Sequence, residues 1–145
     1  MKNITELLSS MRSIGKLYGS FFEPVCQKHN INHGEADILA FLANNPNFNT
    51  ARDIVEYRMI PKANVSQTVD SLIQKGLLSR SGDPNDRRRI HLSITDSGNL
   101  IVPDIQNAQK DFLHTLFSGF TEDEFQTFQE LNMRIINNAS EHLNK

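Results

Sequence analysis

Residues 83–95 read DPNDRRRIHLSIT, and this stretch decides the fold. The first four residues, Asp83 to Asp86, are turn formers, because such side chains hydrogen-bond the nearby backbone or fix its dihedral angles. After the turn, apolar residues recur at every second position, as in a half-buried β-strand: Ile90, Leu92 and Ile94. Three arginines stand where the turn leads into the strand: Arg87, Arg88 and Arg89. The stretch therefore predicts a β-hairpin with a basic tip.

An amphipathic helix is predicted just upstream, over residues 62–76. One helical face is apolar, with Val65, Val69, Leu72 and Ile73, and the other is largely polar, with Lys62, Asn64, Ser66, Gln67 and Ser71. A polar helix face by itself is more often a solvated surface than a DNA-reading one. Followed by a basic hairpin, it fits DNA recognition, because a helix enters the major groove and arginines enter the minor groove. The two elements together predict a winged helix-turn-helix.

The composition limits the classes of protein that this chain can represent. A chain of 145 residues fits one domain, and its net charge of −2 hides a basic centre: residues 52–90 hold eight Lys/Arg against five Asp/Glu. A basic centre in an acidic frame favours one docking face. A single cysteine excludes an intrachain disulfide framework, and no apolar run reaches the roughly 18 residues of a membrane span. We expect a cytoplasmic protein without a signal segment or a membrane partner.

The ends of the chain are predicted to be helical. The first helix carries a heptad pattern of apolar residues, which suits either a core helix or a subunit contact: Ile4, Leu7, Met11, Ile14, Tyr18, Phe21 and Val25. Pro24 should end or kink this helix near Glu23, because proline lacks a backbone donor.

Cap signals divide the rest of the chain into further helices. Helices are predicted to start at residues 32–35 and at Thr50, where Asp53 completes the cap. Pro61 directly precedes the amphipathic helix, and Gly76 is expected to end it. Beyond the hairpin, Thr95-Asp96 is expected to cap one long helix kinked at Pro103. Thr121 and Glu124 form a capping box for the last helix, which should turn these residues inward: Phe128, Leu131, Ile135, Ile136 and Ala139. The fold class is therefore mostly α with a small β-hairpin.

Four segments of the chain form a recognisable series: Val65-Ser66-Gln67 through Leu72; Lys75-Gly76-Leu77-Leu78; Asp83-x-x-Asp86-Arg87-Arg88; and Leu92-x-Ile94-Thr95-x-x-Gly98. In their order and separation they resemble the MarR family of bacterial transcriptional regulators. The resemblance implies a homodimeric winged-helix protein, usually a repressor, that binds palindromic double-stranded DNA and releases it when a small hydrophobic molecule or an oxidant acts. The resemblance also implies a division of the chain. Dimerisation is expected of residues 1–30 and 96–145, and DNA binding of residues 31–95, with the wing at about 77–95.

The resemblance also assigns roles to residues. Arg88 resembles the arginine that enters the minor groove, and Asp86 resembles the aspartate that orients it, which we expect to pair with an arginine side chain. The expected DNA-binding residues are Lys62, Ala63, Asn64, Ser66, Gln67, Ser71, Arg87, Arg88 and Arg89. The expected dimerisation residues are Ile4, Leu7, Met11, Ile14, Phe112, Leu116, Phe128 and Ile135. No cofactor and no metal are implied.

Other chemistry was weighed against this interpretation. Cys26, His29 and His33 could approach one another as metal ligands, joined by Glu35 or His114, but a second cysteine and a close histidine pair are missing. Cys26 could instead sense peroxide if nearby cations lowered its thiol pKa. An enzyme is disfavoured, because the chain lacks a glycine-rich phosphate loop, a Gly-x-Ser-x-Gly elbow and a His-Glu-x-x-His helix. A winged-helix module that binds acidic proteins stays open as an alternative.

Overall fold

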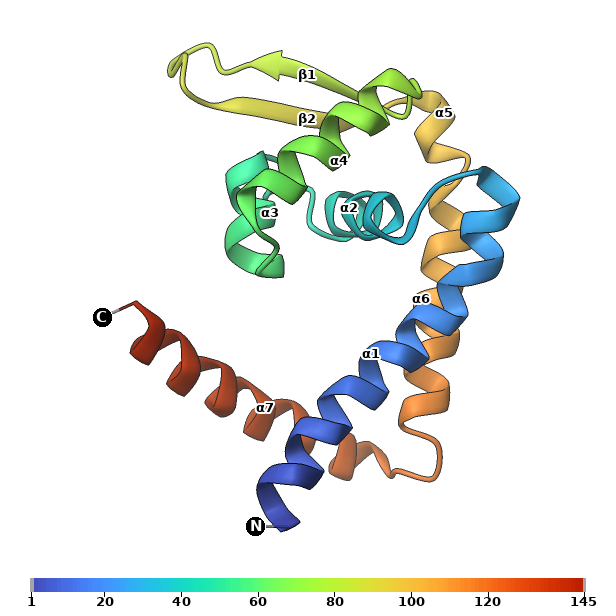
Figure 1. Cartoon of the computed structure of the whole chain (residues 1–145), viewed down its shortest axis with the longest axis vertical. Coiled ribbons are helices and arrows are strands. Elements are labelled where there is room, and N and C mark those ends of the chain that lie inside the picture. The colour runs from blue at the N-terminus through green and yellow to red at the C-terminus, as the bar shows by residue number, and fades with distance from the viewer. Residues whose placement is uncertain (1, 145) are drawn as a thin grey trace. The chain divides into compact units, whose positions relative to one another are not determined.

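The computed structural model describes residues 2–144, and the chain forms two compact units, Met1–Phe112 and Leu113–Lys145. Figure 1 shows a mostly helical chain with one antiparallel hairpin, which confirms the predicted fold class. No helix in this described part is long and apolar enough to cross a membrane. The elements are α1 (Lys2–His29), α2 (His33–Asn44), α3 (Ala51–Arg58), α4 (Lys62–Gln74), β1 (Leu78–Gly82), β2 (Ile90–Ile94), α5 (Asp96–Asn99), α6 (Val102–Leu116) and α7 (Glu122–Leu143).

Local capping chemistry starts three of these helices where the sequence predicts. Asn32 with Glu35, Thr50 with Asp53, and Thr121 with Glu124 form complete capping boxes, in which each side chain accepts from the backbone N–H of the other residue. Gly76 adopts a left-handed conformation with φ of 74° just after α4. These helix boundaries are set by side chains within three residues of the helix start or by one glycine.

Pro24 does not end α1, so the predicted helix end near Glu23 was wrong, and the alternative, a kink at this proline, stays a prediction. The helix continues through the proline to His29. The two residues after Pro24, Val25 and Cys26, are buried in the core, and Lys28 and His29 both contact the carboxylate of Asp104 at 2.9 Å and 2.7 Å. These tertiary contacts hold the last turn in helical geometry despite the missing backbone donor.

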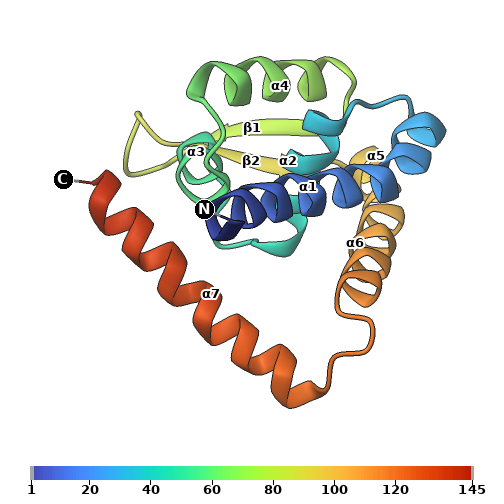
Figure 2. The ribbon, with the colours of Figure 1, turned by 60° about the horizontal axis from the view of Figure 1, so that its bottom comes forward.

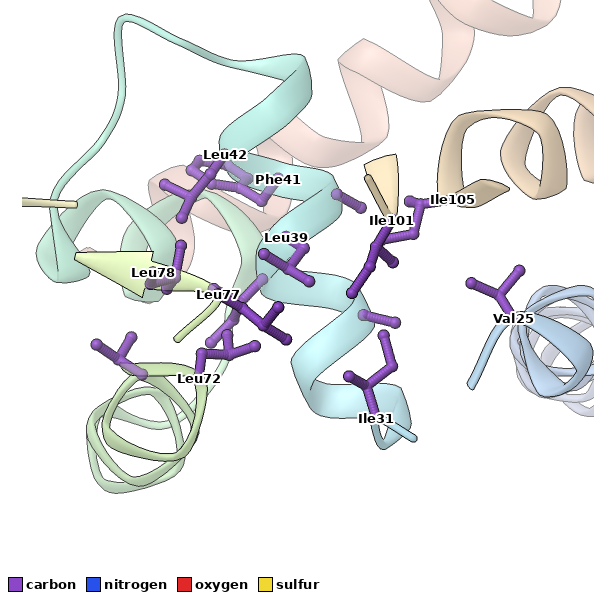
Figure 3. Packing of buried hydrophobic residues seen from close by; sticks show 14 of the residues in the cluster. Val25, Ile31, Leu39, Phe41, Leu42, Leu72, Leu77, Leu78, Ile101 and Ile105 are labelled. Atoms are coloured by element: carbon purple, nitrogen blue, oxygen red, sulfur yellow. The ribbon is translucent and has the colours of Figure 1, made fainter. Parts of the chain in front are cut away.

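The core of the first unit lies between α2, α4, the hairpin and the segment that leads into α6 (Figure 3). Leu39 and Leu72 are fully buried, and Leu77 and Leu78 join them from the start of the hairpin. Burial of such side chains typically contributes about 1.5–3 kcal/mol each. The apolar faces of α2 and α4 thus pack against each other in the core. The opposite face of α4 is left exposed to solvent or to a ligand.

The hairpin is a regular two-stranded antiparallel sheet. Its register pairs Leu78 with Ile94 at the base and Gly82 with Ile90 at the outer end. The predicted alternation holds only partly, because Leu92 is buried and Ile94 half-buried, whereas Ile90 is 47% exposed. Ile90 lines an open cleft beside α3 and α4, and the loop beyond it projects from the core, as Figure 2 shows.

The single long helix predicted after Thr95 is also wrong. Thr95 accepts from the Gly98 N–H and caps only the short helix α5, and a new helix, α6, starts at Val102. Pro103 lies in the first turn of α6, where a missing N–H costs little. Pro103 has no backbone N–H to donate to the carbonyl of Asn99, four residues earlier, so α5 and α6 do not join into one helix.

Within the first unit, α1 and α6 run antiparallel. Near one end of the pair, Lys28 forms an ion pair with Asp104. Further along, the Tyr18 hydroxyl accepts a hydrogen bond from the Gln109 side chain at 3.0 Å. The Tyr18 ring packs edge-to-face on Phe112, with the ring centroids 5.0 Å apart. Phe112 is only 8% exposed because of this packing. Its expected role in dimerisation is therefore corrected: it is a core residue of its own chain.

The second unit is organised by aromatic side chains. Phe117 packs against Phe120, Phe125 and Phe128, with ring centroids 4.6–5.5 Å apart. The cluster fixes the turn before α7, in which Gly119 has φ of 83°. None of the described residues of α7, 122–143, is buried. Of the residues expected to pack inward, Phe128 contacts Phe117 within this unit, whereas Leu131, Ile135 and Ile136 are exposed.

Candidate nucleic-acid interface

The second helix of the helix-turn-helix, α4, presents a polar face to solvent. Val65, Val69 and Leu72 are buried against α2 and α3, and the opposite face carries exposed Lys62, Ala63, Asn64, Ser66 and Gln67. Met59 makes the turn between α3 and α4 with a left-handed conformation, φ 56° and ψ 37°. The expected reading residues thus lie where a groove of DNA could reach them.

Ser71 is an exception, and its expected place on the outer face is wrong. Its hydroxyl donates to Oε2 of Glu35 at 3.0 Å, and its side chain lies half-buried between α2 and α4. Oε1 of Glu35 accepts from Lys75 Nζ at 2.8 Å and from the Asn32 N–H at 3.0 Å. Burial raises the pKa of the Glu35 carboxyl, but these donors outweigh it, so its pKa lies below the ordinary value.

The wing tip is held by backbone hydrogen bonds to two carboxylates. Oδ1 of Asp83 accepts from the N–H groups of Asn85 at 2.8 Å and Asp86 at 3.1 Å. Asp86 was expected to pair with an arginine side chain, and instead its Oδ1 accepts from the backbone N–H of Arg88 at 2.9 Å. The hydrogen bond from His91, with those from the two amides, holds the pKa of Asp83 below its usual range. Asp86 therefore shapes the backbone that carries Arg88.

The three wing arginines are exposed, and Arg52 of α3 lines one cleft with Arg88 and Arg89. Arg52 of α3 and Arg80 of β1 line a cleft of about 560 Å³, together with Lys62 and Ser66 of α4 and Ile90 of the hairpin. Arg80 also forms an ion pair with Asp70 of α4, which ties the hairpin to this helix. Neither Arg52 nor Arg80 belongs to the motifs that predict the site, although both contribute to the excess of basic residues over 52–90.

The residues weighed as a sensor site do not come together. His29 bonds Asp104, and His33 bonds Glu23 with Nε2 and Oε2 2.8 Å apart. Across residues 2–144, no three His, Cys, Asp or Glu side chains are grouped closely enough to hold a metal ion. Cys26 is buried, and burial with the charge of Glu23 raises its thiol pKa. That shift opposes the thiolate that a peroxide sensor requires.

The expected subunit-contact residues are mostly uncovered in the single chain. On α1, the exposed fractions of Ile4, Leu7, Met11 and Ile14 range from 39% to 58%. In the second unit, Leu116 is half-buried, and Phe128 and Ile135 are exposed. Apolar side chains that lie together on one exposed face often mark an interaction surface.

Comparison with known proteins identifies relatives of this arrangement. The model of the MarR family matches residues 29–89. The HTH-type transcriptional regulator PapX of Escherichia coli is 25% identical over 114 residues, which cover 78% of this chain and 70% of PapX. The Staphylococcus aureus MepR–DNA complex matches with TM-score 0.75 and 21% identity, covering 90% of this chain and 96% of MepR. Bordetella bronchiseptica BpsR, whose DNA binding is regulated by 6-hydroxynicotinic acid, matches with TM-score 0.71 and 19% identity over 90% and 98% of the chains.

Proposed function

We propose that this chain is a MarR-family transcriptional regulator, because that family's model matches residues 29–89, and that it represses transcription by binding a palindromic operator as a homodimer. Its family and relatives are regulators of transcription and not enzymes. One observation carries the proposal: Lys62 and Ser66, on the exposed face of α4, line the same cleft as Ile90, which directly follows the three wing arginines. The reading helix and the first residue of the strand that leaves the wing thus line one cleft.

Each half of this surface suits a different groove. Asn64 and Gln67 have amide side chains that can bond an adenine edge in the major groove, and Lys62 can reach a guanine or a phosphate. Arg88, with Arg87 or Arg89, suits the minor groove, where narrow A·T-rich segments have an enhanced negative potential. The wing would position the protein, and α4 would read the sequence.

The exposed apolar face of α1 supports dimerisation. Two copies joined through residues 1–30 and 96–145 would place two reading helices on one DNA face, with half-site centres about 10 base pairs apart. A small hydrophobic effector would bind between these arms and the reading module. It would release DNA by favouring a different spacing of the reading helices, and its difference in affinity for the two states sets the size of the effect.

The proposal is tested by recovering bound DNA. The purified protein is mixed with fragmented DNA of its source organism at physiological salt, and bound fragments are sequenced. We expect enrichment of a palindrome with half-sites one helical turn apart. Recovery of fragments without an enriched sequence would contradict operator recognition. No recovery at all would favour the alternative function, a winged-helix module whose arginines bind acidic proteins.

Loss of a base-reading side chain should reduce specificity. We expect Asn64→Ala and Gln67→Ala each to weaken binding to the enriched palindrome about tenfold, because a bidentate contact to a base contributes about 1–3 kcal/mol. Binding to a scrambled duplex should change little, as fluorescence anisotropy would show. Asp96→Ala, on the exposed start of α5, is the control. Equal losses on both duplexes would remove these two residues from the reading face.

Loss of the wing arginine should act differently. We expect Arg88→Ala to weaken binding to both duplexes by a similar factor of about ten and to reduce the steepness of the salt dependence, because a phosphate-rich groove loses one cation. Titrations between about 50 and 200 mM salt measure both quantities. Lys110→Ala, an exposed cation of α6, is the matched control. An unchanged affinity in Arg88→Ala would exclude the wing from DNA binding.

A further inference from the structure

His91 joins the wing to the body of the first unit. Its Nδ1 lies 2.6 Å from Oδ1 of Asn49, in the segment before α3, and its Nε2 lies 2.8 Å from Oδ2 of Asp83, at the outer end of β1. The side chain of His91 is 27% exposed and that of Asp83 is 16% exposed. Partly buried hydrogen bonds to a carboxylate are stronger than fully exposed ones, because water competes less for the same groups.

The backbone supports the same junction. Leu92 donates its N–H to the carbonyl of Asn49 at 2.8 Å, and Thr50 pairs with His91 as an isolated antiparallel bridge. Thr50 is also the N-cap of α3. The inner part of β2 is therefore attached to the start of the helix-turn-helix, whereas the residues beyond Ile90 have no such attachment among the described backbone hydrogen bonds.

Hydrogen bonds continue from this junction to the wing tip. One oxygen of Asp83 contacts His91, and its other oxygen accepts from the N–H groups of Asn85 and Asp86. Asp86 in turn accepts from the N–H of Arg88. The side chain of His91 thus connects Asn49, on the rigid body, to the backbone of Arg88 through only two carboxylates.

We propose that His91 is a positioning residue for the wing: it anchors Asp83 to Asn49 and so fixes where Arg88 meets DNA. The proposal rests on the proposed function, because Arg88 is taken as the side chain that enters the minor groove. The wing loop projects from the core and its arginines are exposed, so its direction depends on contacts at its base. An unanchored loop would lose conformational entropy when DNA binds, and the anchor removes part of that cost in advance.

The first experiment measures the anchor without DNA. Hydrogen exchange of the wing amides is compared in the wild type, His91→Leu, His91→Gln and the matched strand control Ser93→Leu, whose exposed position on β2 pairs with Ser79. We expect faster exchange at Asn85, Asp86 and Arg88 in His91→Leu, and unchanged exchange in α4. His91→Gln keeps a donor and should restore part of the protection. Unchanged exchange at the wing amides in His91→Leu would overturn the proposal.

The second experiment asks whether His91 acts through Arg88. Anisotropy titrations use a 30-base-pair duplex that carries the enriched palindrome. We expect His91→Leu to weaken binding about fivefold, the size expected for the net contribution of one typical hydrogen bond, and Ser93→Leu to have little effect. In an Arg88→Ala background, His91→Leu should cause no further loss. The same fivefold loss in that background would show that His91 acts elsewhere and would overturn the proposal.

The two experiments separate this inference from the proposed function. If the wild type binds no duplex, the proposed function in DNA binding is wrong. The proposed role of His91 in positioning Arg88 on DNA is then wrong too, whatever the hydrogen-exchange result. If the wild type binds the palindrome and His91→Leu neither weakens binding nor frees the wing amides, only the role of His91 fails. Thermal unfolding of each variant checks that the core is intact, and a lowered midpoint with uniformly faster exchange in α4 would mean a general loss of structure and contradict the inference.

Discussion

Lys75→Met is expected to lower the free energy of unfolding by about 3 kcal/mol, the low end of the range for breaking a buried ion pair. Lys75 donates to the fully buried carboxylate of Glu35 and to the carbonyl of Asn30, 2.8 Å and 2.9 Å away. Methionine fills similar space but leaves the carboxylate charge without its cation. Two remaining donors, Ser71 and the Asn32 N–H, and the partial exposure of Lys75 keep the loss from being larger. Urea unfolding followed by circular dichroism measures the change.

Two control variants isolate the charge effect at Glu35. Lys110→Met replaces an exposed lysine of α6 and should change the stability by less than about 0.5 kcal/mol. The double variant Glu35→Gln/Lys75→Met removes both charges and should recover much of the loss, because no ion is left buried alone. If the double variant has a free energy of unfolding about 3 kcal/mol below that of Lys75→Met, the unpaired charge does not explain the loss.

Gly98→Ala is expected to destabilise the first unit by about 2–3 kcal/mol, as overpacking in a close-packed core does. Gly98 is buried beside the start of the hairpin, and an added Cβ would collide with the backbone carbonyl of Leu77 and lie 2.6 Å from Cγ2 of Ile94. The Leu77 carbonyl also accepts from the Thr95 N–H at 3.1 Å, so it cannot move freely. Thermal unfolding should show a midpoint lowered by several degrees.

Gly82→Ala is the matched control for this position. Gly82 ends β1, and an added Cβ there meets no atom within 4 Å. We expect its effect on the unfolding midpoint to be small. If both glycine variants unfold at the wild-type temperature, the close approach of α5 to Leu77 is not a constraint on this fold.

The sequence predicted what depends on neighbours along the chain. Capping boxes such as Thr121 with Glu124 are encoded within four residues, and the hairpin follows from a turn and an alternating strand. The predicted resemblance to the MarR family agrees with the match of that family's model to residues 29–89. The base-reading and dimerisation roles stay predictions, since they depend on a partner molecule that a single chain does not contain.

The wrong predictions share a physical cause, which is contact between distant segments. Pro24 lies in a helix that continues because Asp104 and the core hold its last turn. Ser71 lies at the border between the two faces of α4, and only the buried Glu35, 36 positions away, decides which way it turns. Phe112 fits a subunit-contact pattern equally well, but it packs against Tyr18. Periodicity identifies an apolar or polar face without saying what covers it.

The continuity of α1 through Pro24 gives this helix a mechanical property. A helix of 28 residues is about 42 Å long, at 1.5 Å per residue. Its C-terminal end is held by packing in the core and by the contacts with Asp104. Its N-terminal half, with the exposed apolar residues, extends away from these contacts. A rigid rod held at one end amplifies rotation, so a tilt of about 5° at that end displaces the far end by about 3–4 Å, from the same rise per residue. Repacking around Val25 and Cys26 that tilted α1 by this angle would therefore move its far end by about 3–4 Å.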